Sequence, residues 1–397
     1  MQTKAGDPGA FAHFDLSRVD SPAFVVDAAK LRANCRVLAG VRDAAAADGA
    51  DIKVFAALKA FSMWSAAPII GEYLDGVSTS GLWEARLASE FYDGEIATYS
   101  AAFKPEELEE ICRLSDHVIF NSPFQHERAR LILDHAAANG AKVSVGLRIN
   151  PQVPTGEVAK YDPSAPGSRL GFPLDQLTEE HMEGVEGIHF HNLCEQDFEP
   201  LKATWDRVFD VIEPFFGQLK WINMGGGHHI TRADYQREEL VEFLKDAAED
   251  TGCQIILEPG EAVALDAGIL VGTLLDTMFN EVPVGITDIS ATCHMPDVLE
   301  APYRPAMLGE LRDPDLIPIR LGGPSCLAGD VIGDYRLPVP AEPGARFAFL
   351  DQAHYSMVKT NTFNGVALPS IWMWDSETDA LDCIKRFDYQ DFRDRLS

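Results

Sequence analysis

The residues best suited to chemistry stand where apolar, strand-like runs end. Lys59 directly follows one such run, residues 54–58 (VFAAL). A run of this kind predicts a buried strand, and burial pushes a lysine toward the neutral amine that attacks carbonyl groups. The plainer interpretation is a lysine that ends a strand and reaches solvent along its aliphatic stem. The other strand ends must decide between these two interpretations.

Three more strand ends carry groups that complement such an amine: His191, then Gly225, Gly226 and Gly227, then Glu258. Glycines let backbone N–H groups approach an anion, and a buried carboxylate needs a protonated partner. A tight turn and a satisfied core histidine are the alternatives. Together the four groups fit pyridoxal 5′-phosphate. The lysine takes the aldehyde, the glycines the phosphate, the glutamate the ring nitrogen, and the histidine a ring face.

The pattern that positions these groups is an alternation of short apolar runs with helical stretches. Runs that are apolar throughout are typical of strands covered on both faces. The predicted strands are 52–58, 76–80, 96–100, 117–121, 142–149, 187–191, 219–224 and 253–257. The predicted helices are 28–47, 82–92, 105–114, 124–139, 199–215 and 235–249.

Eight such units predict a (β/α)8 barrel, whose strands end at one mouth. An open doubly wound sheet is the second choice, but no GxGxxG motif follows the first strand. After about residue 270, short β-type runs separated by Pro and Gly replace the helical pattern. We therefore expect a barrel over 24–270 and a β-rich domain over 271–397. Residues 1–23 are expected to join the β-rich domain.

The net charge of the chain limits the classes of ligand that the protein is expected to bind. The chain has 33 Lys and Arg against 62 Asp and Glu, a net charge of −29. That charge argues against nucleic acid and anionic membranes, and it suits a cationic ligand, although solubility or an acidic proteome explains it equally well. No apolar run is long enough for a membrane span, and the first 15 residues lack a signal core. We expect a cytoplasmic protein. The seven cysteines include no CxxC pair, so neither a disulfide framework nor a metal site is expected.

Seven ordered motifs resemble a known family. In order and spacing, Lys59, His191, the glycine triplet and Glu258 resemble the alanine racemase-like, pyridoxal phosphate-dependent decarboxylases. More specifically, the chain resembles the carboxynorspermidine (carboxyspermidine) decarboxylase family along nearly its whole length. The motifs are ALKAF (57–61), HNLCE (191–195), NMGGGHH (223–229), EPGEA (258–262), TCHMPD (292–297), GGPSCLAGD (322–330) and KTNTFNG (359–365).

The resemblance implies roles at the cofactor. Lys59 would bind the cofactor aldehyde, Glu258 would hold the pyridine nitrogen, and His191 would stack on the ring. The glycine triplet together with Tyr355 would hold the phosphate. It also implies a homodimer with shared active sites, in which Cys326 from one subunit protonates the carbon that loses CO2 in the other.

The resemblance also implies the substrate contacts. Related ornithine and diaminopimelate decarboxylases carry EPGR where this chain has EPGE, so Glu261 replaces an arginine that lies near anions. With Asp297, Glu261 would bind the protonated amines of a carboxylated polyamine. Asp330 is a further candidate ligand, although a turn-forming aspartate explains it equally well. Roles stay open for Arg148, Cys194, His228, His229 and His294.

Three alternative functions remain. One is a decarboxylase of the same fold acting on ornithine, arginine or diaminopimelate. Another is an amino-acid racemase, which would need two bases. The third is a pyridoxal-binding homologue without activity, against which the presence of both Lys59 and Cys326 argues. A preference between carboxynorspermidine and carboxyspermidine does not follow from the sequence, because their tails differ by one methylene.

Overall fold

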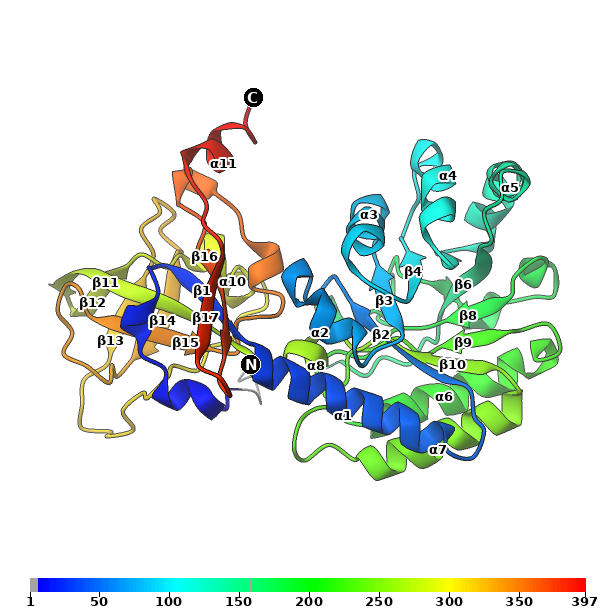
Figure 1. The fold of residues 1–397 in the computed structure, drawn as a ribbon, viewed down its shortest axis with the longest axis horizontal. Coiled ribbons are helices and arrows are strands. Elements are labelled where there is room, and N and C mark those ends of the chain that lie inside the picture. Colours follow the sequence, from blue (N-terminus) through cyan, green and yellow to red (C-terminus); the bar gives the residue numbers. More distant parts are fainter. Residues whose placement is uncertain (1–5, 157–158) are drawn as a thin grey trace. The chain divides into compact units, whose positions relative to one another are not determined.

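A computed structural model describes residues 6–156 and 159–397 (Figure 1). The chain divides into two compact units, one formed by Met1–Ala33 with Ala264–Ser397 and the other by Asn34–Val263. The expected barrel range of 24–270 is therefore longer than the second unit at both ends. Residues at both its ends pack with the β-rich unit instead, because their backbone pairs with strands there.

The unit Asn34–Val263 is a closed barrel, which confirms the predicted fold class. Its parallel strands follow the order β5-β4-β3-β2-β10-β9-β8-β6, and β6 pairs with β5 to close the ring. The strands are β2 (Ile52–Ala57), β3 (Gly76–Thr79), β4 (Glu95–Tyr99), β5 (His117–Phe120), β6 (Ser144–Asn150), β8 (Gly187–His189), β9 (Trp221–Asn223) and β10 (Gln254–Leu257). A two-residue strand, β7 (Phe172–Pro173), extends from the end of β6.

Helices surround these strands (Figure 1). They are α2 (Ala67–Gly71), α3 (Leu82–Phe91), α4 (Pro105–Leu114), α5 (Pro123–Ala138), α6 (Glu199–Ile212) and α7 (Arg237–Thr251). Local sequence explains their ends. The first turn of α4 carries Pro105 and two glutamates, and its last turn carries Arg113, an order that suits the helix dipole. Helix α7 stops at Gly252, whose φ of 65° is left-handed.

Trp221 fills the amino-terminal end of the barrel. Its indole lies against two glycines, and a Cβ atom would come within 2.3 Å of it at Gly146 and 2.0 Å at Gly187. Its Nε1 donates to Ser144 Oγ at 2.8 Å, and the ring meets His117 edge to face at 5.0 Å. This end of the barrel is therefore closed by packing, and the open end lies where the strands finish.

The β-rich unit is a mixed sheet in the order β14-β13-β12-β11-β1-β16-β17, with β15 on β11. Its core gathers Phe11 and Phe14 against Trp374 from β16. The strands are β1 (Ala23–Asp27), β11 (Gly268–Asn280), β12 (Val282–Thr287), β13 (Ile319–Gly322), β14 (Val331–Tyr335), β15 (Arg346–Leu350), β16 (Ser370–Asp375) and β17 (Ala380–Lys385). The short helices are α8 (Glu261–Ala264), α9 (Ala291–His294), α10 (Asp297–Glu300) and α11 (Tyr389–Arg393), of which α8 spans the division between the units.

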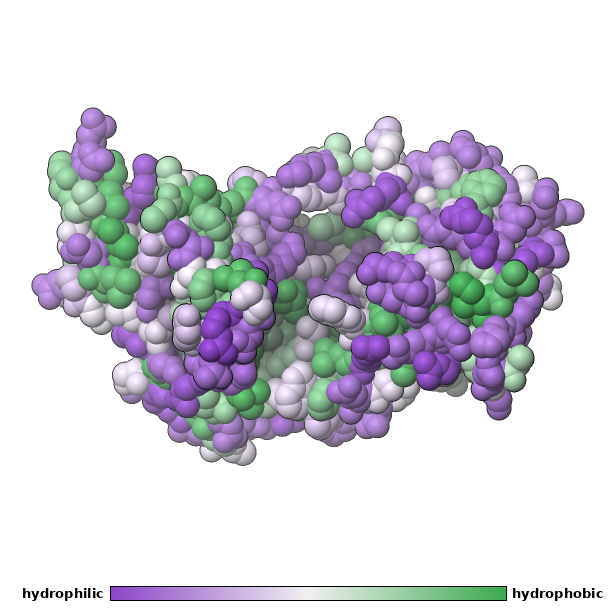
Figure 2. Space-filling view, turned by 90° about the horizontal axis from the view of Figure 1, so that it is seen from above, coloured by the Kyte–Doolittle hydropathy of each residue, from purple (hydrophilic) through white to green (hydrophobic). Residues whose placement is uncertain are grey.

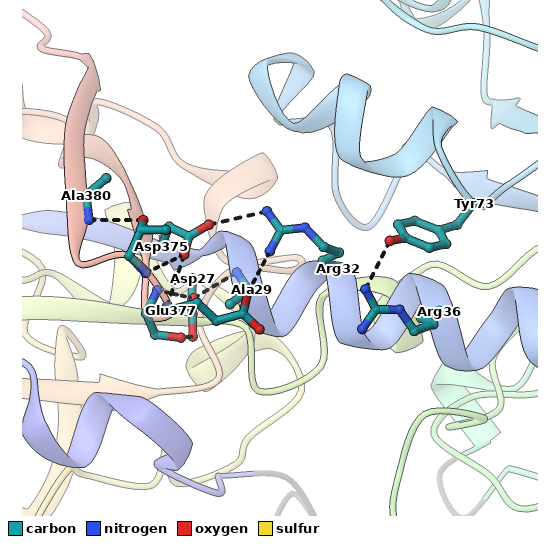
Figure 3. A network of polar contacts seen from close by, with 10 residues as sticks. Asp27, Ala29, Arg32, Arg36, Tyr73, Asp375, Glu377 and Ala380 are labelled. Atoms are coloured by element: carbon teal, nitrogen blue, oxygen red, sulfur yellow. Dashed lines mark hydrogen bonds and ion pairs between the residues drawn. The ribbon is translucent and has the colours of Figure 1, made fainter.

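Helix α1 (Ala28–Ala46) begins in the β-rich unit and continues into the barrel unit (Figure 3). Asp27 caps it, because its Oδ1 accepts from the N–H of Ala29 at 3.0 Å. One turn on, Arg32 pairs with Asp375 at 3.3 Å. A further turn along, Arg36 Nη2 donates to the hydroxyl of Tyr73 at 3.2 Å. The helix start is therefore fixed by side chains from β1 and β16.

Hydrophilic residues dominate the face drawn in Figure 2, and hydrophobic residues form separate patches on it. Within the described residues, no helix is both long enough and apolar enough to cross a bilayer.

Candidate active site

Lys59 follows β2 in a turn at the open end of the barrel, where solvent reaches its side chain. Protein atoms still surround the amine closely, and this burial lowers the pKa of Lys59 from 10.5 to about 8. The positive charge of Arg148 contributes to this lowered pKa, and the carboxylate of Glu258 opposes it. Lys59 is therefore a good nucleophile near neutral pH.

His191 lies beside this amine, with its Nε2 2.9 Å from Lys59 Nζ. Its other ring nitrogen, Nδ1, accepts from the backbone N–H of Gly226 at 3.1 Å. Burial lowers the pKa of His191 well below its ordinary value, so the ring is neutral. With Nδ1 accepting, the single ring proton lies on Nε2 and points at Lys59. That hydrogen bond uses the lysine lone pair, so it forms in the fraction of molecules whose amine is neutral.

Glu258, which follows β10, is held by two barrel residues that the sequence analysis missed. Asn223 Nδ2 donates to Oε1 at 2.7 Å, and His189 Nε2 lies 3.3 Å from Oε2. Burial alone would raise the pKa of Glu258, but these two partners and Lys59 outweigh it and leave the pKa below its ordinary value. The carboxylate is therefore ionised and can hold a protonated ring nitrogen.

The loop of Gly225, Gly226 and Gly227 is packed too tightly for side chains. A Cβ atom would come within 2.5 Å of backbone oxygen at Gly225 and 2.0 Å at the other two. The N–H of Gly225 donates to Asn223 Oδ1 at 2.9 Å, and that of Gly226 to His191. The N–H of Gly227 is therefore the one this loop offers to an anion, because it has no partner among the described residues.

Arg148 is buried at the end of β6, and burial lowers its pKa. Its Nη2 donates to the carbonyl of His191 at 2.8 Å, and its guanidinium lies 4.5 Å from the Tyr99 ring centroid. The negative charge of Glu258 counters the effect of burial, so Glu258 is an acid close enough to stabilise this cation. Arg148 fixes the backbone that carries the histidine.

Glu261 is the first residue of α8, and its Oε1 lies 3.3 Å from His229 Nε2. The neighbouring His228 is buried and its Nδ1 lies 2.6 Å from the hydroxyl of Tyr235. Burial lowers the pKa of His228 to about 3, so it stays neutral. His229 thus faces Glu261, whereas His228 packs into the barrel wall. Cys194 is exposed just beyond β8.

Cys326 and Asp330 lie on one loop of the β-rich unit, between β13 and β14. Cys326 is exposed, and its N–H donates to Asn364 Oδ1 at 2.6 Å. Asp330 is buried, and its Oδ2 accepts from Ser290 at 2.8 Å and Ser325 at 2.6 Å. Its Oδ1 accepts from the N–H of Thr292 at 3.2 Å. These bonds favour the turn-forming interpretation of Asp330, which shapes the loop that presents the thiol.

Asp297 begins α10 in the same unit, and both its oxygens accept from Lys359 Nζ, at 2.6 and 2.9 Å. Tyr355 lies nearby, with its ring centroid 5.3 Å from the same ammonium and a left-handed φ of 47°. His294 is bonded elsewhere, accepting from Ser290 N–H at 3.1 Å and lying 2.9 Å from the carbonyl of Ala367. Burial lowers its pKa to about 4, so it is neutral and holds α9.

The structure thus brings together Lys59, His191, the glycine loop and Glu258 in the barrel unit. It places Cys326, Asp330, Asp297 and Tyr355 in the β-rich unit. The additional residues His189 and Asn223 could have been found from one signal: each is the polar last residue of an otherwise apolar strand.

Comparison with known proteins gives three close similarities. The chain is 38% identical over 388 residues to a carboxynorspermidine/carboxyspermidine decarboxylase of Campylobacter jejuni, covering 94% of this chain and 98% of that protein. It is 37% identical over 386 residues to a carboxyaminopropylagmatine decarboxylase of a Synechocystis species, covering 96% of each. A decarboxylase of the first kind from Herminiimonas arsenicoxydans is 32% identical over 384 residues, 96% of this chain and all of that protein.

Comparison with solved structures also finds decarboxylases. The crystal structure of carboxynorspermidine decarboxylase from Campylobacter jejuni, complexed with norspermidine, matches with a TM-score of 0.85 at 38% identity, over 95% of this chain and 100% of that one. A diaminopimelate decarboxylase from Helicobacter pylori matches with a TM-score of 0.82 at 18% identity, over 96% of this chain and 97% of that one, and shares the fold. No protein-family model matches the chain.

Proposed function

Since the chain belongs to the carboxynorspermidine/carboxyspermidine decarboxylase family, we propose that it releases the α-carboxylate of carboxynorspermidine or carboxyspermidine as CO2. The products are norspermidine and spermidine, so the reaction belongs to polyamine biosynthesis. The observation that carries the proposal is identity at the 38% level along nearly the whole chain. Glu261 adds a chemical reason, because a carboxylate at that position suits a cationic substrate.

We propose pyridoxal 5′-phosphate as the cofactor. Four groups of the barrel unit support it: the amine of Lys59 with its lowered pKa, the ionised carboxylate of Glu258, the ring of His191 and the N–H of Gly227. Tyr355 is proposed as a second phosphate contact. When bound, the cofactor accepts the electron pair that the departing carboxylate leaves behind.

The chain's own residues then have distinct tasks. Glu258 keeps a proton on the ring nitrogen, and Asn223 and His189 keep Glu258 ionised. Lys59 Nζ would hold the cofactor covalently through its aldehyde when no substrate is bound. Cys326 donates a proton from Sγ to the α-carbon after CO2 has left. Glu261 and Asp297 bind the tail ammonium groups, and Asp330 acts through the loop around Cys326.

We propose a homodimer in the cytoplasm, with Cys326 serving the partner subunit's site. Exposed apolar side chains on β11 support an interface on the β-rich unit: Leu275 is 49%, Met278 54% and Phe279 75% exposed. The free, exposed Cys326 thiol also suits the reducing conditions of a cytoplasm. The mass of the protein in solution tests the dimer.

A second substrate, carboxyaminopropylagmatine, is favoured by the 37% identity to the Synechocystis enzyme over 96% of both chains. Its tail ends in a guanidinium, which pairs with a carboxylate through two parallel hydrogen bonds. Glu261 and Asp297 would accept that end as well as an ammonium. The two candidates therefore share one chemistry, α-decarboxylation of a polycationic amino acid, and differ in the tail.

The test is a comparison of kcat/KM for CO2 release by the purified holoenzyme. The panel contains carboxynorspermidine, carboxyspermidine, carboxyaminopropylagmatine, ornithine, arginine and diaminopimelate. Carboxynorspermidine or carboxyspermidine as the best substrate supports the first proposal. A best rate on carboxyaminopropylagmatine selects the second candidate. A best rate on ornithine, arginine or diaminopimelate overturns both, and so does α-proton exchange without CO2 release, which indicates a racemase. A protein that binds the cofactor without any turnover is the inactive homologue.

A further inference from the structure

The carboxylate proposed to bind a substrate amine already holds an ammonium of its own chain. Lys359 Nζ lies 2.6 and 2.9 Å from the two oxygens of Asp297. Both residues stand on short elements of the β-rich unit, Asp297 at the start of α10 and Lys359 at the end of the 3-10 turn Met357–Lys359. No other cation of the described residues forms an ion pair with Asp297.

The position of Lys359 is defined on a second side by an aromatic ring. Its Nζ lies 5.3 Å from the Tyr355 ring centroid, within cation–π range. Its backbone N–H donates to the carbonyl of Tyr355 at 3.0 Å. Tyr355 has a left-handed φ of 47°, a conformation that is uncommon for residues other than glycine. Lys359 therefore connects the proposed phosphate contact to the proposed amine contact.

The side chain of Lys359 ends in the same chemical group as the tail of the proposed substrate. A lysine side chain ends in a primary ammonium on a flexible alkyl stem, as does the tail of a carboxylated polyamine. We propose that Lys359 occupies the distal ammonium subsite at Asp297 and is displaced by the substrate tail, so that Lys359 is a specificity-determining residue. The inference rests on the proposed function.

Exposure makes the displacement feasible. The Lys359 side chain is 40% exposed and that of Asp297 22% exposed, and ion pairs of this kind are weak and exchange readily. A substrate ammonium can replace the lysine with little net loss. A neutral tail gains nothing from the exchange. An anionic tail is repelled by Asp297, which also keeps Lys359 neutralised, so neither residue offers it a partner. The ion pair of Lys359 with Asp297 therefore admits cationic tails, and competition from Lys359 raises the KM for substrates that carry them.

The test uses two substitutions of Lys359 in the holoenzyme. Lys359→Met keeps the stem and removes the competing charge, so KM for carboxynorspermidine should fall up to about fivefold with kcat unchanged. In Lys359→Arg, the guanidinium can form two parallel hydrogen bonds with the Asp297 carboxylate and is harder to displace, so KM should rise. Norspermidine binding, measured by calorimetry, should follow the same order. 2,4-Diaminobutyrate, which keeps the amino-acid head and lacks the distal amine, should show no change.

Controls separate this role from a structural one. Lys385→Met removes a similar exposed pair of the same unit, with Asp391 at 3.6 Å, and should leave KM unchanged. With Asp297→Asn in the background, Lys359→Met should again lower KM, because the freed ammonium otherwise repels the tail. Equal KM values for the wild type, Lys359→Met and Lys359→Arg would refute the inference while leaving the decarboxylase intact. A wild type inactive on every carboxylated polyamine would instead remove the proposed function, and this inference with it.

Discussion

The lowered pKa of Lys59 has a consequence that is measurable without turnover. Burial and Arg148 bring the pKa from 10.5 to about 8. At pH 7 about one amine in ten is then neutral, against about three in ten thousand for an ordinary lysine, an advantage of about 300-fold. Because only the neutral amine attacks an aldehyde, the cofactor-free protein should combine with pyridoxal 5′-phosphate at a rate that rises with pH up to about 8 and then levels off.

The assay is borohydride trapping after short exposures to pyridoxal 5′-phosphate, with peptide mass spectrometry to count modification at each lysine. Lys53, which is paired with Glu95, serves as the internal control and should stay unmodified near neutral pH. Substitutions of two charged neighbours of Lys59 should shift the midpoint of this pH dependence in opposite directions. Arg148→Met removes a positive charge and should move the midpoint above 8, and Glu258→Gln removes a negative charge and should move it below 8.

A midpoint near 10.5 would refute the account of Lys59, because it would mean that the barrel mouth does not disfavour the ammonium. Shifts of the two variants in the opposite directions would refute the assignment of its neighbours. Trapping at lysines other than Lys59 would show that the covalent attachment was assigned wrongly.

Three further predictions follow from single side chains. Cys326→Ala should lower kcat for CO2-linked product formation by about 100- to 10,000-fold with little change in KM, as expected for loss of a proton donor and measured by steady-state kinetics. Glu261→Arg should lower kcat/KM for carboxynorspermidine at least about 100-fold, because it replaces a cation ligand with a cation; an unchanged ratio would contradict the substrate assignment. Trp221→Ala should reduce the free energy of unfolding by about 3–5 kcal/mol in urea, since it empties the closed end of the barrel.

The barrel could be predicted from the sequence because its signal is local. Each strand is a short apolar run beside an amphipathic helix, and the predicted range 105–114 matches α4 to the residue. The second sheet depends on pairing between distant segments. Strand β1 lies between β11 and β16, a place for which the sequence has no local signal. Strand β11 runs for thirteen residues across the expected domain boundary at residue 270, and its outer half is largely exposed.

The site divides in the same way. Lys59, His191 and Glu258 stand at strand ends, where position in the chain predicts position at the mouth. His189 and Asn223 fell inside the predicted strands 187–191 and 219–224, whereas in the structure each is the last residue of a shorter strand and holds Glu258. The pair of Lys359 with Asp297 joins residues 62 apart in the chain, which no spacing rule predicts. The burial of Asp330 is likewise a product of tertiary structure.

If this chain decarboxylates a carboxylated polyamine through Lys59, the substrate carboxylate must appear as CO2 only when Lys59 is present. Carboxynorspermidine labelled with 13C in its carboxylate is given to the purified wild type and to Lys59→Ala, and labelled CO2 and norspermidine are counted together. We expect equal amounts of both from the wild type and neither from Lys59→Ala. Norspermidine formed at the wild-type rate by Lys59→Ala, or no labelled CO2 from the wild type, would contradict it.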